Sequence, residues 1–90
     1  MRFAIICTDK PGALQIRLDT RAEHLAYLET TGVVEQAGPF LNNAGEMCGS
    51  LLILEVADMQ AAKEWAASDP YAKAGLFEAV SVQAWKRVIG

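Results

Sequence analysis

The chemistry suggested by this sequence begins with its one histidine, His24, and with Asp69-Pro70-Tyr71, which lies far along the chain. An imidazole beside a carboxylate forms a general base that needs neither a metal nor a cofactor. The carboxylate accepts a hydrogen bond from one ring nitrogen, and the other nitrogen is left to take a proton from a substrate. If folding brings His24 and Asp69 together, we expect proton abstraction or addition–elimination, with His24 as the base and Asp69 as its orienting partner.

Four further polar residues are candidates for substrate binding at such a site: Arg17, Arg21, Ser50 and Tyr71. The two arginines would give a positive rim suited to an anionic or phenolic molecule, and Tyr71 would exchange a hydrogen bond at the pocket wall. Ser50 stands at the start of a predicted strand, where it could face the cleft as a nucleophile. The residues around it do not form a nucleophile elbow, so the sequence gives a hydrolytic mechanism little support.

Each of these residues also has a structural interpretation. Arginines on helices are commonly solvated. A lone histidine near the start of a helix is commonly exposed or hydrogen-bonded for structural reasons, and an aspartate before a proline is commonly a helix cap. Residue types alone therefore favour structural roles over catalytic ones.

The composition is that of one folded domain over residues 1–90, with 52% hydrophobic and 21% charged residues. A domain of this size hides only part of its surface, so the apolar excess predicts burial against a second copy, in a homodimer or a higher oligomer. The net charge is −3 and the acidic residues are scattered, with no basic stripe. These features argue against nucleic acid and anionic membranes as partners.

Targeting and metal-binding signals are not recognised in the sequence. Apolar runs such as residues 51–54 are too short to span a bilayer, and the first residues do not resemble a signal peptide, so we expect a cytoplasmic protein. Cys7 and Cys48 lack the spacing of a metal or redox motif and are expected to be buried free thiols. We therefore expect no metal and no cofactor.

A long helix is predicted to carry His24. From Ala13 to Gly32 apolar residues recur at helical spacing, which predicts a buried stripe. The stripe consists of Leu14, Leu18, Ala22, Leu25 and Leu28. Thr20 and Glu23 fit a capping box, so the helix is expected to restart at Thr20 and to hold His24 at the edge of the apolar face.

The remaining elements complete a strand-helix-strand-strand-helix-strand order. Strands are predicted over residues 3–8, 33–37, 49–56 and 77–88, with a helix over 58–67 and a short helical piece that begins at Pro70. The second strand is expected to end before Gly38-Pro39, and Asp69 is expected to cap the short helical piece. This order predicts the ferredoxin-like α+β sandwich, a four-stranded antiparallel sheet with both helices on one face. Because the strands carry apolar residues on both sides, a second sheet is expected to cover the other face.

The sequence resembles the YciI-like family, also called YCII-related domains, almost from end to end. The matching segments are Arg17, Arg21-Ala22-Glu23-His24-Leu25, Ala37-Gly38-Pro39, Gly49-Ser50 and residues 69–77, the last being the most specific. The resemblance implies a ferredoxin-like fold that forms a dimeric α/β barrel, with His24 and Asp69 at the positions of the family's catalytic pair. Some relatives eliminate chloride from a chlorinated hydroxyquinol, but the resemblance implies a site geometry more firmly than a substrate. Trp85 occupies a position where relatives often carry a different residue.

Three functions remain open from the sequence. The first is a small cofactor-independent enzyme, a lyase or related hydrolase, that acts on a small phenolic or anionic metabolite through His24 and Asp69. The second is a homodimeric module that binds a small molecule in the same cleft without turnover. The third is an accessory protein whose apolar surface meets another protein.

Overall fold

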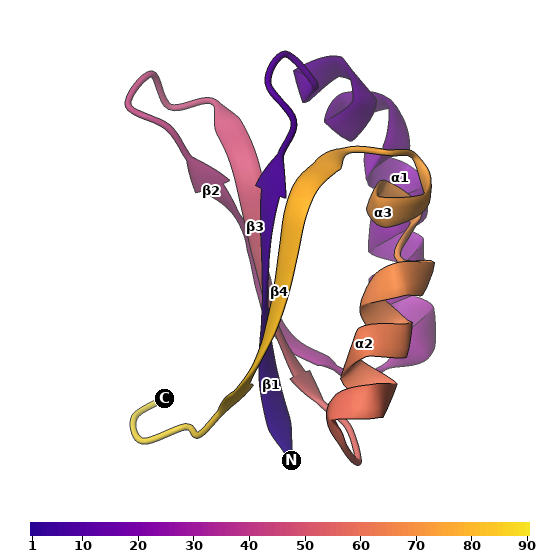
Figure 1. The fold of residues 1–90 in the computed structure, drawn as a ribbon, viewed down its shortest axis with the longest axis vertical. Coiled ribbons are helices and arrows are strands. Elements are labelled where there is room, and N and C mark those ends of the chain that lie inside the picture. The colour runs from indigo at the N-terminus through magenta and orange to yellow at the C-terminus, as the bar shows by residue number, and fades with distance from the viewer.

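Four antiparallel strands form a single sheet, and three helices pack on one of its faces, in the computed structural model of residues 1–90 (Figure 1). The strands are β1 (Arg2–Asp9), β2 (Val34–Leu41), β3 (Met47–Glu55) and β4 (Phe77–Trp85), and the helices are α1 (Leu14–Thr31), α2 (Met59–Ser68) and α3 (Pro70–Lys73). The strand order is β2-β3-β1-β4. This arrangement confirms the predicted ferredoxin-like α+β fold. The sheet of one chain is open and does not close into a barrel.

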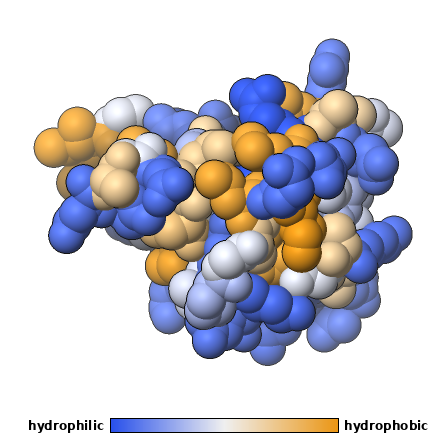
Figure 2. All heavy atoms as spheres, turned by 90° about the horizontal axis from the view of Figure 1, so that it is seen from above, coloured by the Kyte–Doolittle hydropathy of each residue, from blue (hydrophilic) through white to orange (hydrophobic).

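The main apolar core lies between the two central strands and α2. It consists of Phe3, Ile5 and Cys7 of β1, Leu52 and Leu54 of β3, and Ala62, Trp65 and Ala66 of α2. Leu54 and Ala62 are fully buried. In the end-on view of Figure 2, apolar residues gather across the middle of the visible surface, and polar residues lie along most of its edge. Alternating side chains on the strands therefore supply one face of the core, as the period of two requires.

The other side of the sheet is covered by no element of the chain, and we call it the open face (Figure 1). By the strand register its residues are Arg2, Ala4, Ile6, Thr8, Gln36, Gly38, Phe40, Gly49, Leu51, Ile53, Glu55, Ala79, Ser81, Gln83 and Trp85. Arg2 and Glu55, which are cross-strand neighbours, are its charged residues, and Arg2 also forms an ion pair with Glu35. Ile6, Phe40, Leu51 and Trp85 are large apolar residues that remain exposed there.

Helix α1 is continuous from Leu14 to Thr31, so the predicted restart at Thr20 is wrong. A capping box requires a non-helical residue at its first position, and Thr20 lies in the middle of the helix. The predicted apolar stripe is also wrong in part, because Leu18 and Leu25 are exposed while Arg17 and His24 are buried. Seven residues make about two helical turns, so Arg17 and His24 share one inward face.

Helix α2 ends and α3 begins around a proline. Pro70 occupies the first turn of α3, and Asp69 between the two helices has the extended conformation that a following proline favours. Gly75 closes α3 with a φ of 76°, in the left-handed region that glycine tolerates. None of the three helices has both the length and the apolar composition that crossing a membrane requires.

Two strands differ from the prediction. β2 continues through Gly38 and Pro39 to Leu41, which is possible because β2 is an edge strand and its outer side needs no N–H donor. In β4 a register shift between Thr8 and Asp9 packs the partly buried Phe77 against the core. The last strand ends at Trp85, before the predicted boundary.

The two cysteines should differ in reactivity. Burial raises the pKa of the Cys7 thiol to about 12, with a smaller contribution from the charge of Asp69. Because the thiolate is the reactive form, Cys7 should resist iodoacetamide at about pH 8, whereas the partly exposed Cys48 should be alkylated. Peptide mass spectrometry of the native protein, with a urea-unfolded sample as control, measures both sites. Equal labelling of the two cysteines in the native protein would contradict this burial.

Candidate active site

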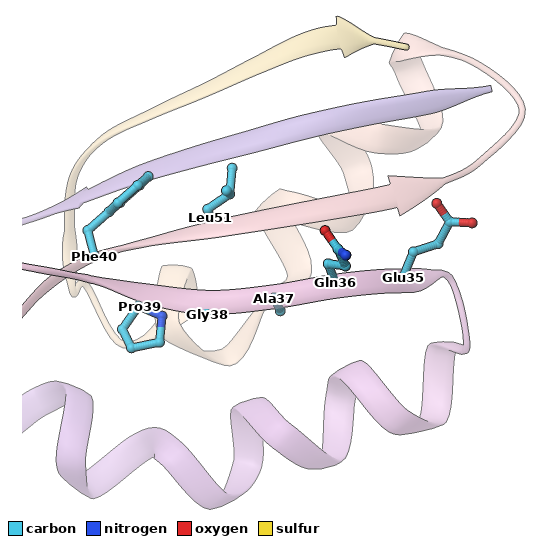
Figure 3. Close-up of a pocket in the computed structure, with 7 residues that line it drawn as sticks. All are labelled: Glu35, Gln36, Ala37, Gly38, Pro39, Phe40 and Leu51. Carbon is cyan, nitrogen blue, oxygen red and sulfur yellow. The ribbon is translucent and has the colours of Figure 1, made fainter. Parts of the chain in front are cut away.

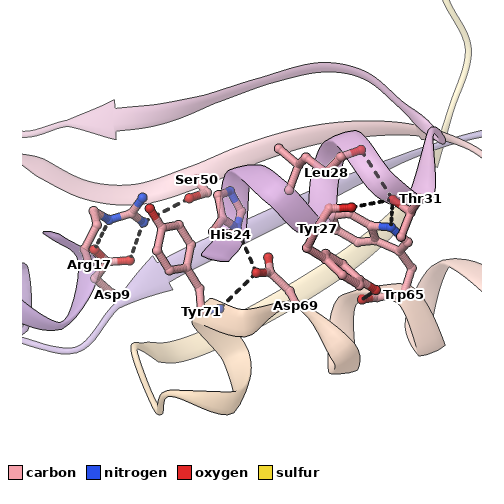
Figure 4. A network of polar contacts seen from close by, with 10 residues as sticks. All are labelled: Asp9, Arg17, His24, Tyr27, Leu28, Thr31, Ser50, Trp65, Asp69 and Tyr71. Atoms are coloured by element: carbon pink, nitrogen blue, oxygen red, sulfur yellow. Dashed lines mark hydrogen bonds and ion pairs between the residues drawn. The ribbon is translucent and has the colours of Figure 1, made fainter. Parts of the chain in front are cut away.

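His24 on α1 and Asp69 between α2 and α3 are in contact (Figure 4). Their closest atoms, His24 Nδ1 and Asp69 Oδ1, are 2.8 Å apart, and both residues are buried. With the Nδ1 proton donated to the carboxylate, Nε2 carries the ring's lone pair. Nε2 makes no hydrogen bond within the chain. Every fully buried side-chain nitrogen in the structure has a hydrogen-bond partner, so Nε2 is not fully buried and is open to the adjoining cavity. This is the geometry of an oriented general base.

Tyr71 holds the other side of the imidazole. Its ring stacks on the ring of His24 with the centroids 3.9 Å apart and the planes 15° from parallel. Its backbone N–H donates to Asp69 Oδ1 at 3.0 Å, so the same oxygen caps α3 and binds the histidine. Asp69 is therefore both a helix cap and the partner of His24, and the same oxygen atom makes both contacts.

A second buried pair lies on the opposite side of Tyr71. Arg17 donates from Nε and Nη2 to the two carboxylate oxygens of Asp9, each at 2.8 Å, and Nη2 also donates to Ser50 Oγ at 2.9 Å (Figure 4). The guanidinium carbon lies 4.8 Å from the centroid of the Tyr71 ring, within cation–π distance. Arg17 Nη1 makes no hydrogen bond within the chain. Because no fully buried side-chain nitrogen lacks a partner, Nη1 is accessible and remains available to a ligand. The network runs from Asp9 through Arg17 and Tyr71 to His24.

These side chains line a cavity of about 190 Å³ between α1, β2 and β3. Its lining consists of Arg17, Arg21, His24, Leu25, Leu28, Ala37, Gly38, Pro39, Met47, Ser50, Leu52 and Tyr71. Five of the six predicted site residues are in this list, and the sixth, Asp69, lies behind His24. Of the two arginines predicted to form a positive rim, only Arg21 is exposed, because Arg17 is buried in its pair with Asp9.

The protonation states of Arg17, Tyr71 and Ser50 make these three side chains hydrogen-bond donors to a molecule in the cavity. Burial lowers the pKa of Arg17, but the hydrogen bond and charge of Asp9 outweigh it, so the net pKa is raised and the guanidinium stays charged. Burial raises the pKa of Tyr71, partly offset by Arg17 and Arg21, so its hydroxyl stays a neutral donor. The hydroxyl proton of Ser50 is free to donate, since Oγ accepts from Arg17. No cluster of metal-ligating side chains lies here or elsewhere in the chain.

The comparisons with known proteins agree with this fold and sequence pattern. A family model described as the YCII-related domain matches residues 1–86. The chain belongs to the YCII-related domain family. Another member, protein YciI of Escherichia coli O6:H1, is 38% identical over 97 residues that cover 98% of this chain and 99% of YciI. The predicted family resemblance is thereby confirmed.

Solved structures extend the YCII-related comparison. The 5-chloro-2-hydroxyhydroquinone dehydrochlorinase of Burkholderia phenoliruptrix, in complex with 2,5-dihydroxybenzoquinone, superposes with a TM-score of 0.86 at 40% identity, covering 96% of this chain and 94% of that one. An antibiotic biosynthesis monooxygenase has a TM-score of 0.60 at 15% identity and covers 98% of both chains. The second similarity concerns the fold alone.

Sequence reasoning missed Asp9, which lies just beyond the first predicted strand, residues 3–8, but is the last residue of β1. The residue continues the alternation of Phe3, Ile5 and Cys7, which all face the helices, and this spacing was the available signal. The predicted partner of Arg17 was a substrate, whereas its first partner is this carboxylate. Whether Arg17, Arg21, Ser50 and Tyr71 bind a substrate remains a prediction.

Replacing Asp9 should show how much the buried ion pair between Asp9 and Arg17 contributes to the free energy of unfolding. Asp9→Asn removes the negative charge beside Arg17, which is 3% exposed, and leaves a buried cation without its counter-charge. We expect the free energy of unfolding to fall by about 3 kcal/mol, the lower end for a broken buried ion pair. Urea denaturation measures the change, with Asp19→Asn as the matched control because Asp19 accepts only an exposed hydrogen bond from Gln15. Equal stability of the two variants would contradict a structural ion pair.

Proposed function

We propose that this chain is a cofactor-independent enzyme that eliminates a leaving group from a small phenolic or otherwise anionic molecule, with His24 as the general base. The observation that carries the proposal is the 2.8 Å contact between His24 Nδ1 and Asp69 Oδ1 at the wall of the cavity. A base oriented in this way, with its free nitrogen toward a bound molecule, meets the geometric requirement for proton abstraction. The activity is thus assigned to the lyase class.

The proposed step balances without a cofactor. The step starts from the keto tautomer of the substrate, in which the carbon that bears the leaving group is saturated. His24 Nε2 takes a proton from an O–H group of this tautomer, and the electron pair left behind moves through the conjugated system to expel an anionic leaving group such as chloride. Asp69 stabilises the imidazolium that forms, because it already accepts the Nδ1 hydrogen. The imidazolium then releases its proton to solvent. Substrate has lost one proton and one anion, and no redox change occurs.

The other lining groups are suited to hold the developing negative charge. Arg17 Nη1, the Ser50 hydroxyl and the Tyr71 hydroxyl are donors on the side of the cavity that adjoins the imidazole, and Arg21 adds a second positive charge. Donors fixed before the reaction stabilise charge as it develops, which is commonly a large part of catalysis. The cavity volume of about 190 Å³ suits a molecule with a single ring.

The solved relative supports this reaction class. It is named a dehydrochlorinase of a chlorinated hydroxyhydroquinone and holds a dihydroxybenzoquinone, and it is 40% identical to this chain. We therefore propose a substrate with a hydroxylated ring, without assigning the chlorinated compound as the natural substrate.

We also propose that the chain acts as a homodimer in the cytoplasm. The exposed apolar residues Ile6, Phe40, Leu51 and Trp85 share the open face, and burying such a face against a copy of itself removes them from water. Two free cysteines suit a reducing compartment. Light scattering of the purified protein measures the mass in solution.

His24→Gln should remove turnover while it spares binding. The amide still reaches toward Asp69 but has no basic nitrogen, so we expect the rate of chloride release from 5-chloro-2-hydroxyhydroquinone to fall by about 100-fold or more. Binding of 2,5-dihydroxybenzoquinone, followed by calorimetry, should persist. Asp19→Asn on the outer surface of the same helix is the control. A wild-type protein that binds the quinone and turns over no chlorinated or unchlorinated hydroxyquinol would favour the binding-module alternative.

Asp69→Asn separates the two functions of that side chain. An amide oxygen can still cap α3 by accepting from Tyr71 N–H, but it no longer stabilises an imidazolium. We expect kcat to fall by about 100-fold with a smaller change in KM. Thermal melting should shift less than for Asp69→Ala, which also loses the cap. A kcat unchanged in Asp69→Asn would show that the carboxylate serves the fold alone.

A further inference from the structure

A second cavity lies where the loop after β1 approaches the hairpin between β2 and β3, at the upper end of the sheet in Figure 1. Its volume is about 300 Å³, larger than that of the cavity beside His24, which we call the active-site cavity. The second cavity is lined by the loop, the start of α1 and the hairpin, through Asp9, Lys10, Pro11, Gly12, Ala13, Leu14, Asn42, Glu46, Met47 and Cys48. Among these residues only Met47 also lines the active-site cavity. The two cavities are therefore neighbours, and Met47 lies between them.

The buried ion pair between Asp9 and Arg17 forms the other part of the boundary between the two cavities. Asp9 lines the second cavity and Arg17 lines the active-site cavity, and two hydrogen bonds of 2.8 Å join their side chains. A pair held by two parallel charge-assisted hydrogen bonds has a fixed geometry. The Met47 side chain is apolar and is held by packing alone. Met47 is therefore the part of the boundary that a single substitution removes without breaking a hydrogen bond.

A β-bulge places Met47 at this boundary. Phe40 pairs with Gly49 and points away from α1, on the open face (Figure 3). The next residue of β2, Leu41, pairs with Met47, so Cys48 is an extra residue in β3. Strict alternation from Gly49 would put Met47 on the open face, whereas the extra residue puts it on the side of the helices, where it lines the active-site cavity. Bulges are common next to active sites, where they redirect a side chain.

We propose that Met47 is a specificity-determining residue, which closes the active-site cavity against the second cavity and so confines the substrate to one ring without a side chain on that side. The kind of substrate rests on the proposed function, whereas the boundary is a feature of the fold. Methionine suits this position because its unbranched, adaptable side chain fills irregular gaps. A shorter residue would join the active-site cavity to a space that has both apolar and polar walls, including Leu14 and Asn42. That space would hold a substituent of the ring.

Met47→Ala tests this boundary through the ratio of two affinities, which a general loss of stability would leave unchanged. The probes are 2,5-dihydroxybenzoquinone and its 3-propyl derivative, and calorimetry measures both Kd values. We expect the wild type to bind the propyl compound about tenfold or more weakly than the parent compound, because the propyl group meets the Met47 side chain. In Met47→Ala the two Kd values should lie within about threefold of each other, since the propyl group then enters the second cavity. Leu14→Ala is the matched control, because it enlarges the second cavity, leaves Met47 in place and should discriminate as the wild type does.

A wild type that binds both quinones equally, or a Met47→Ala variant that discriminates between them as the wild type does, overturns the proposal. If circular dichroism shows that Met47→Ala is unfolded, Met47→Val takes its place, because valine is also shorter and suits a strand. The same ratio is expected of Met47→Val, and discrimination like that of the wild type overturns the proposal. If the wild type binds neither quinone, the proposed function fails, and a crystal structure of the folded variant decides on Met47. One continuous cavity from His24 to Lys10 supports the boundary, and two separate cavities overturn it.

Discussion

The site depends on one oxygen atom, Asp69 Oδ1, which accepts hydrogen bonds from two separate helices. One donor is the ring of His24 on α1, and the other is the backbone N–H of Tyr71 on α3. A carboxylate that is 2% exposed requires such donors, because burying it unpaired costs several kcal/mol or shifts its ionisation. The position of the imidazole is thus fixed by the same bonds that allow the chain to bury this acid. Stacking of Tyr71 on His24 follows, since Tyr71 lies two residues after the cap.

The inward face of α1 carries polar residues where a layer of leucines was expected. Arg17 and His24 are satisfied by Asp9, Ser50 and Asp69, and no buried side-chain nitrogen or oxygen in the chain lacks a partner. Toward the end of α1 the contact with α2 is also partly polar. Tyr27 donates to the carbonyl oxygen of Trp65, and the indole N–H of Trp65 donates to Thr31. The helix is therefore positioned by directional bonds along its length.

The fold was largely predictable, because β-strand alternation and turn residues are local signals and the resemblance extends over the whole chain. The pairing of His24 with Asp69 was predictable only from the resemblance, since no spacing along the chain relates the two. The predicted buried stripe of α1 was wrong in part, and the cause is physical. Hydropathy assigns leucines inward, but Leu18 and Leu25 are exposed and Arg17 is buried because Asp9 compensates its charge. Burial of a charge depends on its partner, and the partner lies on another element.

The two buried pairs also determine how charge is distributed around a bound molecule. With a neutral imidazole, Asp9, Arg17 and Asp69 leave the interior beside the cavity with one excess negative charge. In the proposed reaction, the proton that moves from the substrate to His24 cancels that excess, and the substrate becomes the anion. The total charge of protein and substrate is unchanged by the transfer. Counter-ions therefore need not enter or leave the enclosed space while the proton moves.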